Sequence, residues 1–493
     1  MSKFHVNVVD KRKNSTQSYE DGRVYSKSLE NSWTNMLFSS ILQPQFYETS
    51  EVQQNRFIEL TNSMIEKYGC ELIGKSAIFS RNELGMRSIS ELLAAILNGY
   101  NWEQKRNFYS KYFRRPDGVG EVFAAIDSIG GKRSHAFIRG CSDYLSSLSD
   151  YQLAKYPLRN HKYNMHDLIN LTHANSETIN KFQRGELASP ETWEVLVSSA
   201  SCSEDREKAW KYLVEEKKLG YLALLRNLRN ICSCSFASRD WITKYLIPQI
   251  EDNQAIRHSL VWPIQIYTAW KVLKEESFPI SVEYALSNAF LQSTKNIPEL
   301  SGNTLIVLDV SGSMENSFSK NGALTIKEVC AVYASAFLNC DFKDNVEFIK
   351  FGEYATYFDK SRFQDCNVFA EIKNLSDNDR CGYSTRLAPV FDTINKHYDR
   401  ILLFSDMQVM DSTDYRVATY RPSMTADQMF KAYCEEFGRS HIYSFDLGNY
   451  STQVTSSDSD ISYVTALNDI VFKLIAIQES GRSLLDVIRD YSY

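Results

Sequence analysis

Residues 304–313, Thr-Leu-Ile-Val-Leu-Asp-Val-Ser-Gly-Ser, decide the fold of the second part of this 493-residue chain. Apart from Asp309, the first seven of them are apolar or β-branched, which is typical of a strand buried on both faces in a parallel α/β sheet. Asp309, Ser311 and Ser313 come at its carboxyl end, where open α/β sheets place their ligands. On a tight loop relieved by Gly312, these oxygen atoms can point at one hard cation.

Two further oxygen donors follow at suitable places. Thr385 lies in a glycine-containing loop, Cys-Gly-Tyr-Ser-Thr-Arg, before a helical run, and Asp406 ends a second buried strand that starts at Arg400. With Asp309, Ser311 and Ser313, these residues resemble the metal-ion-dependent adhesion site of von Willebrand A domains. The resemblance implies a bound divalent cation, Mg²⁺ in the simplest case. The alternative is that both aspartates only cap the helices that follow, although capping does not require two carboxylates at the ends of two buried strands.

Composition sets the outer limits of the interpretation. A chain of 493 residues exceeds a single core, so two or more domains are expected. The ten cysteines are scattered, and the nearest pair, Cys232 and Cys234, lacks a second pair with histidine, so reduced thiols are expected rather than a zinc site. The first residues lack the apolar core of a signal peptide, and no run approaches a membrane span. We therefore expect a cytoplasmic, monomeric protein with no membrane partner.

Charge is distributed unevenly along the chain. Residues 1–300 hold 37 Lys and Arg against 34 Asp and Glu, a net charge of +3, whereas residues 301–493 hold 18 against 27, a net charge of −9. A polyanion is therefore expected to meet the first part. Because +3 over 300 residues is small, a nucleic-acid site there has to be a local patch.

The sequence pattern divides the chain into three parts. Residues 1–40 are polar and are interpreted as an N-terminal arm with one short element. Residues 41–298 are dominated by short amphipathic helices without strands, which indicates paired helices in a bundle or a HEAT-like solenoid. The first clear one contains Ile89 and Leu97, and Ser88 with Glu91 is typical of a capping box. Similar stripes lie at 120–129, 136–148, 165–171, 190–200, 206–213, 222–231, 241–250, 263–273 and 281–294.

Beyond the boundary, near residues 297–301, strands and helices alternate. This alternation predicts a doubly wound α/β domain over residues 299–493. Strands are expected at 304–310, 345–351, 354–358, 400–405, 441–446 and 461–465. Helices are expected at 322–339, 366–373, 386–397, 425–437 and 480–490. The fold class is therefore multidomain, with an α-helical part followed by an α/β part.

Basic residues in the helical part are candidates for contact with phosphates. Several stand beside aromatic residues, as Arg114 and Arg115 do beside Tyr109, Tyr112 and Phe113. Such interleaving suits single-stranded nucleic acid, in which phosphates need cations and bases need stacking faces. The alternative for each cluster is an ordinary solvated helix face. The candidate RNA-binding residues are Arg133, Arg139, Lys155, Lys162, His166, Arg226 and Arg229, of which the last two are expected on the side of their helix away from Leu224, Leu225, Leu228 and Ile231.

Motifs in this order resemble one family. They are Arg81-Asn-Glu-Leu-Gly-Met-Arg87, Tyr151-Gln-Leu-Ala-Lys-Tyr156, His166-Asp-Leu-Ile-Asn-Leu-Thr-His173 and Leu224-Leu-Arg-Asn-Leu-Arg-Asn230, followed by Asp309-Val-Ser-Gly-Ser313. Together with the pairing of a helical and an α/β part, they resemble the Ro autoantigen, or TROVE, family over almost the whole chain.

The resemblance implies a ring of HEAT-like helical repeats closed by a von Willebrand A domain. It implies that single-stranded 3′ ends of misfolded or noncoding RNA enter the ring, that small structured Y RNAs bind its basic outer face, and that exoribonucleases are partners in bacterial relatives. Arg139 and Lys155 match basic residues of the family's RNA-binding region. Met165 stands where relatives carry an RNA-binding histidine, and His166 follows one place later, about 100° further around a helix.

Three functions are compatible with these residues. The first is passive binding of RNA ends, since no Ser/His/Asp arrangement, glycine-rich phosphate loop or HExxH pattern indicates an enzyme. The second is a protein-interaction module in which a partner's Asp or Glu completes the metal shell while the helical part is a scaffold. The third, a metal-dependent phosphatase or nuclease, depends on the cation alone, because no second metal site or general base is visible.

Overall fold

The stretch from Thr304 forms a central buried strand, β3 (Thr304–Asp309), in the computed structural model of the chain. All six of its residues are buried, as expected for a strand covered on both faces. The structure describes residues 15–17, 23–26, 28–38, 50–83, 85–156, 158, 161–188, 192–198, 200–259, 261–274, 278–297, 299–318, 323–341, 343–359, 367–406, 426–446, 452–453, 461–464, 475–476, 479 and 483–492.

In the described residues, the sheet around β3 has six strands in the order β5-β4-β3-β6-β7-β9. β3 pairs in parallel with both of its neighbours, so that Thr304 lies opposite Val346 on one side and Arg400 on the other. Only β5, at the edge, is antiparallel. Because the chain adds strands to one side of β3 and later to the other, the topology switches between β3 and β6. The other strands are β4 (Val346–Phe351), β5 (Ala355–Tyr357), β6 (Arg400–Ser405), β7 (His441–Asp446) and β9 (Ile461–Val464).

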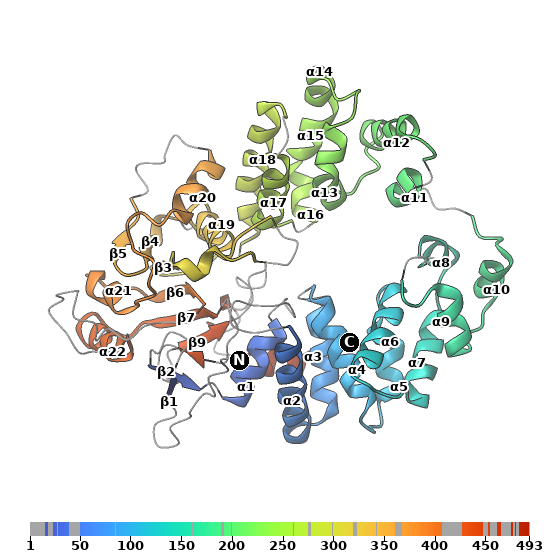
Figure 1. Ribbon diagram of the computed structural model, residues 1–493, viewed down its shortest axis with the longest axis horizontal. Coiled ribbons are helices and arrows are strands. Elements are labelled where there is room, and N and C mark those ends of the chain that lie inside the picture. The colour runs from blue at the N-terminus through green and yellow to red at the C-terminus, as the bar shows by residue number, and fades with distance from the viewer. Residues whose placement is uncertain are drawn as a thin grey trace, which may run out of the picture. The chain divides into compact units, whose positions relative to one another are not determined.

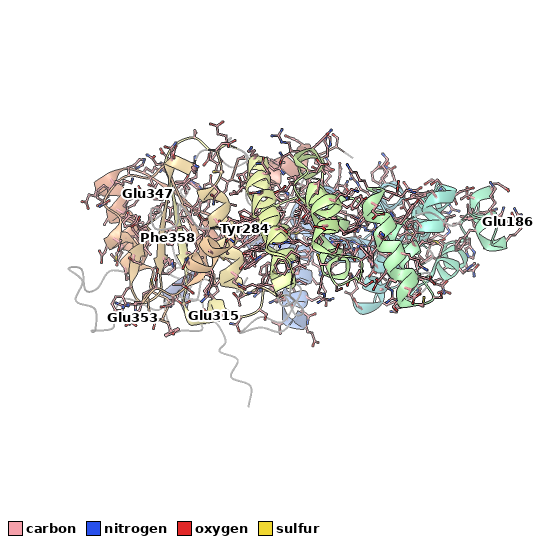
Figure 2. The ribbon with its side chains drawn as sticks, turned by 90° about the horizontal axis from the view of Figure 1, so that it is seen from above. Glu186, Tyr284, Glu315, Glu347, Glu353 and Phe358 are labelled. Carbon is pink, nitrogen blue, oxygen red and sulfur yellow. The ribbon has the colours of Figure 1, made fainter. Side chains whose placement is uncertain are left out.

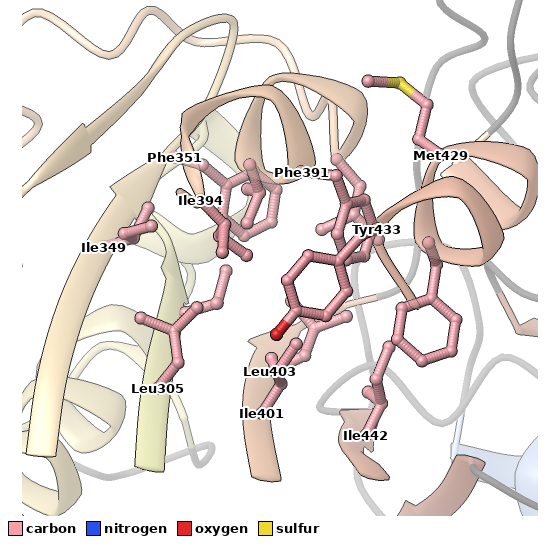
Figure 3. Close-up of a cluster of buried hydrophobic side chains, with 14 of the residues drawn as sticks. Leu305, Ile349, Phe351, Phe391, Ile394, Ile401, Leu403, Met429, Tyr433 and Ile442 are labelled. Atoms are coloured by element: carbon pink, nitrogen blue, oxygen red, sulfur yellow. The ribbon is translucent and has the colours of Figure 1, made fainter. Parts of the chain in front are cut away.

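Helices cover both faces of this sheet (Figure 1). On one face, α21 (Ala388–Thr393) and α22 (Ala426–Phe437) pack on alternate strand residues such as Leu305 and Leu403, which Figure 3 shows with Tyr433 of α22 in one apolar cluster. On the other face, α19 (Ile326–Leu338) contacts β3 and β4 and packs on α20 (Val368–Ser376). The expected strand positions are confirmed to within one residue at each end, and the α/β fold of this part is confirmed.

Between residues 50 and 297 the described residues form helices and no strand, as predicted, and helices two apart in sequence stack on each other, such as α4 on α6, α5 on α7 and α7 on α9. This is the arrangement of a two-layered helical repeat. The helices are α2 (Ser50–Tyr68), α3 (Cys70–Asn82), α4 (Arg87–Asn98), α5 (Lys105–Tyr112), α6 (Asp117–Ser128), α7 (His135–Ser146), α8 (Asp150–Lys155), α9 (Met165–Thr172), α10 (Glu177–Arg184), α11 (Trp193–Ser198), α12 (Ser203–Glu215), α13 (Tyr221–Cys232), α14 (Arg239–Trp241), α15 (Ile247–Ile250), α16 (Asn253–His258), α17 (Pro263–Lys274) and α18 (Ile280–Ser293).

Aromatic residues build the core of the first helices. Tyr109 and Tyr112 are fully buried and Phe113 is nearly so; the ring of Tyr109 contacts that of Phe137 at 4.7 Å, and the ring of Tyr112 contacts that of Phe113 at 5.0 Å. These are three of the residues that the sequence suggested as stacking faces for bases. That interpretation was wrong, because α5 turns its aromatic side inward against α7, and its rings are not available to a ligand.

The N-terminal residues hold more structure than the one short element expected. β1 (Ser15–Gln17) and β2 (Arg23–Ser26) pair antiparallel, and β2 also pairs with β8 (Thr452–Gln453). α1 (Leu29–Phe38) follows, and its Trp33 and Leu37 are fully buried. The sequence did not reveal these strands because their partner β8 is more than 400 residues away along the chain.

The described chain forms two compact units. One comprises residues 1–53 and 211–479, and the other residues 54–210 and 480–493, so the chain passes between the units three times. In the second unit, the C-terminal helix α24 (Leu484–Asp490) packs on α3. Tyr491, just after α24, stacks edge-on against Phe79 at 5.2 Å and hydrogen-bonds Glu83. None of the described helices combines the length and apolar character needed to cross a membrane.

Candidate metal centre and nucleic-acid interface

The oxygen donors singled out from the sequence lie at the carboxyl edge of the sheet. Asp309 ends β3, and Asp406 directly follows the adjacent strand β6, so the two carboxylates flank the point where the topology switches. Both are buried, as are Ser311 and Thr385, whereas Ser313 is half-buried. Two buried carboxylates beside buried hydroxyls at the carboxyl ends of neighbouring parallel strands make this edge a candidate binding site.

Hydrogen bonds hold the aspartate at the centre of this group. Asp309 accepts a hydrogen bond from the backbone N–H of Ser311 at 2.9 Å and one from the hydroxyl of Ser405 at 2.7 Å. The hydroxyls of Ser311 and Ser313 lie 3.4 Å apart. In the described part of the chain Asp309 has no ion-pair partner. Burial raises the pKa of Asp309 to about 6, and a bound cation is the group that would offset the cost of ionising it there.

The loop that carries Thr385 is tied to the same edge. The carbonyl of Tyr383 accepts a hydrogen bond from the backbone N–H of Gly312 at 3.1 Å, and the side chain of Asn378 donates to the carbonyls of Val310 and Gly382 at 3.0 and 2.8 Å. Gly382 has a φ of +80°, a conformation that glycine adopts without strain. These contacts place the loop beside the end of β3.

A buried lysine holds the segment that precedes the Thr385 loop. Lys350 of β4 is fully buried, and its ammonium group donates to the carbonyl of Asn374, to that of Asp377 at 3.0 Å and to the carboxylate of Asp379 at 3.1 Å. A lysine buried in this way is stabilised only by such a complete set of acceptors. Lys350 therefore fixes the segment from which Asn378 reaches β3.

Three residues that support this site were not identified from the sequence. Ser405 was part of the quoted strand, but nothing in the pattern indicated that its hydroxyl would reach Asp309 on the neighbouring strand. Asn378 and Lys350 act through tertiary contacts that no local pattern reveals. The expected role of Gly312 was also wrong, because its φ is not in the left-handed region and the loop instead continues as a short 3₁₀ turn at Gly312–Glu315.

The donor set fits a hard cation better than a soft one. Two carboxylates and three hydroxyls are all oxygen ligands, which Mg²⁺ prefers. Nowhere in the described ranges do three His, Cys, Asp or Glu side chains gather as a metal cluster, so a cation here would depend on the hydroxyls for the rest of its shell. Two acidic residues follow the strands on this side: Figure 2 shows Glu315 and Glu353, which follow β3 and β4, on one side of the domain, whereas Glu347, at the start of β4, lies on the other.

Two of the basic candidates lie together but share a carboxylate. Arg133 and Lys162 both pair with Asp127, Lys162 at 2.8 Å, and the hydroxyl of Tyr163 joins them. These hydrogen bonds, first that of Lys162, lower the pKa of Asp127, so the carboxylate remains charged and offsets one of the two cations. This cluster carries less positive charge than the sequence suggested.

The other candidates in residues 54–210 are Arg139, Lys155 and His166, and none of them shares a carboxylate in the described ranges. Arg139, on α7, has no ion-pair partner among the residues described. Lys155 lies 5.8 Å from the ring of Tyr151, which is 55% exposed, so a cation and an open aromatic face stand side by side. His166 is exposed on α9 and its ring contacts that of Phe182 at 4.8 Å, whereas Met165 is fully buried.

Arg226 and Arg229 lie on α13 in the other compact unit. Both are exposed, and neither has an ion-pair partner in the described parts of the chain. Both lie on the exposed side of α13, away from the buried Leu224, Leu228 and Ile231, as expected, but they line a groove between α13 and α17 together with Leu225, so the expectation does not hold for Leu225. Positions 225 and 229 are four apart and therefore lie on the same side of a helix.

Stacked helical pairs followed by a doubly wound sheet with an oxygen-rich carboxyl edge define the class: a helical-repeat protein with a C-terminal α/β domain. Residues 173–305 match the family model of the TROVE domain. The crystal structure of the Deinococcus radiodurans Ro (RSR) protein has a similar fold, with a TM-score of 0.63 and 14% sequence identity, over 92% of this chain and 100% of that one. A comparison with curated protein sequences gave no match. The TROVE-domain match over residues 173–305 and the similar fold agree with the resemblance to the TROVE, or Ro, family that the motifs suggested.

Proposed function

We propose that this chain is an RNA-binding protein of the Ro type, which holds single-stranded 3′ ends of misfolded or noncoding RNA, and small Y-like RNAs, during RNA quality control or processing. The observation that carries the proposal is the TROVE domain, whose matched region includes the two exposed, unpaired arginines of α13. The RNA-binding part is residues 41–298, and the protein acts as a cytoplasmic monomer without cleaving its ligand.

A lysine beside an exposed aromatic ring supports single-stranded RNA as the ligand. Lys155 beside Tyr151 offers a phosphate contact next to a stacking face, and the exposed ring of His166, packed on Phe182, offers a second aromatic surface for a base. The α/β domain, with its net charge of −9 over residues 301–493, repels phosphates. RNA is therefore bound by the helical part alone. Met165 is buried and the neighbouring His166 is exposed, so His166 takes the place of the family's histidine in contact with a Y-like RNA.

We also propose that residues 299–493 are a von Willebrand A domain that binds Mg²⁺ through Asp309, Ser311, Ser313, Thr385 and Asp406. When bound, the cation would supply positive charge at the sheet edge and an open coordination position. The protein's own part is to hold the Asp309 carboxylate with Ser311 and Ser405 and to fix the Thr385 loop with Asn378.

A second candidate function, which can coexist with the first, is a protein-interaction scaffold. Tyr383, on the Thr385 loop, is 77% exposed, and Tyr354, whose N–H bonds the same loop, is 49% exposed. Exposed tyrosines around a buried polar site are typical of contact surfaces for proteins. The partner, an exoribonuclease for example, would present an Asp or Glu to the cation. Chelation would then release the partner but leave RNA binding unchanged.

The RNA-binding function predicts a preference that depends on salt. An RNA duplex with a 3′ single-stranded tail should bind the full-length protein at least tenfold more tightly than the blunt duplex. For about five phosphate contacts, affinity for the tail should fall about 100-fold between 50 and 200 mM salt. Fluorescence anisotropy with labelled RNAs measures both quantities. Equal affinity for the two RNAs, or binding that salt does not weaken, would refute the proposal.

A further inference from the structure

A groove with a volume of about 270 Å³ runs between α13 and α17. Each helix contributes one stripe of residues spaced i, i+3, i+4 and i+7, which is the spacing of one side of a helix. The stripe of α13 is Leu222, Leu225, Arg226 and Arg229, and that of α17 is Gln265, Thr268, Ala269 and Val272.

The groove exists because the residues in the middle of the α17 stripe are small. The two helices are in contact, and Thr268 and Ala269 have short side chains that leave space between the helices. Leu225 and Val272 give the groove an apolar surface, and most of its exposed lining is apolar. The apolar face of a flat group such as a base would therefore be buried there with a favourable free energy.

Cations that can bind a phosphate, and donors and acceptors that can bind a base or sugar, lie around this apolar surface. Arg226 and Arg229 are exposed cations with no carboxylate partner in the described part of the chain, in contrast to Arg133, which is paired with Asp127. Guanidinium groups bind phosphate through a planar fork of donors. The carboxamide of Gln265 accepts from the backbone N–H of Trp262, which leaves its NH₂ group to donate, and the Thr268 hydroxyl donates to Ile264, which leaves its oxygen to accept.

We infer that this groove is a binding site for a single nucleotide, with the base and sugar against Leu225 and Val272 and the phosphate between Arg226 and Arg229. The volume is near the lower end of the range for small-molecule sites, about 300 to 1,000 Å³, and so admits one nucleotide rather than a longer segment. All groove residues lie inside the region that matches the TROVE domain. The inference deepens the proposed RNA-binding function and rests on it for the source of the nucleotide, which is one residue of an RNA strand.

The test uses the full-length protein and three probes in isothermal titration calorimetry: adenosine 5′-monophosphate, adenosine and inorganic phosphate. The monophosphate should bind at least tenfold more tightly than either part alone. The double variant Arg226→Ala/Arg229→Ala should weaken this binding at least tenfold. Ala269→Phe, which fills the groove without changing charge, should abolish it. Arg257→Ala removes an exposed arginine of α16 outside the groove and should leave binding unchanged, and circular dichroism checks that each variant is folded.

Competition with a labelled ten-nucleotide RNA identifies the source of the nucleotide. Displacement of this RNA by the monophosphate supports a residue of an RNA strand as the occupant, whereas binding without displacement supports a free nucleotide in the same groove. If the monophosphate does not bind, or binds equally to the groove variants, the inference is wrong even when RNA still binds. If it binds in the groove while no RNA binds, the groove assignment holds and the proposed function fails.

Discussion

Replacing Asp309 with alanine is expected to abolish Mg²⁺ binding. Asp309 is fully buried at the centre of the donor group, and two hydrogen bonds, from Ser311 and Ser405, fix its orientation. Without its carboxylate, one of the two charged ligands proposed for the cation is lost. At a concentration 100 times the dissociation constant, Mg²⁺ should stabilise the wild-type protein by about 2.7 kcal/mol. The Asp309→Ala variant should show none of this stabilisation.

Thermal unfolding of the full-length protein with Mg²⁺ and with EDTA measures this effect. Asp344→Ala, which removes an exposed carboxylate of the same domain, is the matched control and should respond to Mg²⁺ as the wild type does. RNA affinity should be the same in all three proteins, because the helical part is proposed to bind RNA. Stabilisation of the Asp309→Ala variant by Mg²⁺ would show that the cation binds elsewhere.

Glu91→Ala is expected to lower the stability of the α3–α4 pair by about 3 to 5 kcal/mol. Glu91 pairs with Arg81 at 3.0 Å, and the two side chains are only 10% and 5% exposed. Arg81 also lies over the ring of Tyr112 at 5.4 Å. Removing the carboxylate would leave a guanidinium buried without its counter-charge, which costs far more than the loss of a surface ion pair.

Hydrogen exchange of the α3 and α4 amides gives the free energy of opening for this pair. The double variant Arg81→Met/Glu91→Leu is the informative control, since replacing both charges with apolar groups of similar size should restore most of the loss. A Glu91→Ala variant that loses less than about 1 kcal/mol would mean that water reaches Arg81 and that the pair behaves as an exposed one.

The same pair illustrates what the sequence could and could not predict. Ser88 and Glu91 have the spacing of a capping box, yet α4 begins at Arg87 with Met86 before it, and Glu91 turns to Arg81 of the preceding helix. A local pattern predicts a local partner. The sequence does not show that Glu91 pairs with Arg81, because this contact forms only when α3 packs on α4. The position of the helix was predicted correctly, because it depends on the apolar period alone.

Strand positions were predictable for a related reason. The strands that begin at Thr304 and Arg400 are apolar on both faces, and only a central position in a parallel sheet buries both faces, so composition and topology agree. These strand positions also predicted that Asp309 and Asp406 lie at the same edge of the sheet. The supporting contacts of Ser405, Asn378 and Lys350 did not, because each joins residues far apart in sequence.

The basic residues divide according to their neighbours. Seen in the sequence, Arg133 and Arg226 are equivalent cations on amphipathic helices. In the structure, Asp127 neutralises part of the charge around Arg133, whereas Arg226 faces an apolar groove without a carboxylate partner in the described chain. Charge counting along a helix does not distinguish these cases. Their contribution to RNA binding stays a prediction.

Crosslinking tests most directly whether the helical part, and not the α/β domain, binds RNA. The full-length protein would be irradiated with a single-stranded oligonucleotide that carries 4-thiouridine, and the crosslinked peptides identified by mass spectrometry. If the helical part binds RNA, we expect crosslinks within residues 41–298, including the peptide that contains Tyr151 and Lys155, and none within residues 299–493. Crosslinks confined to residues 299–493 would contradict it.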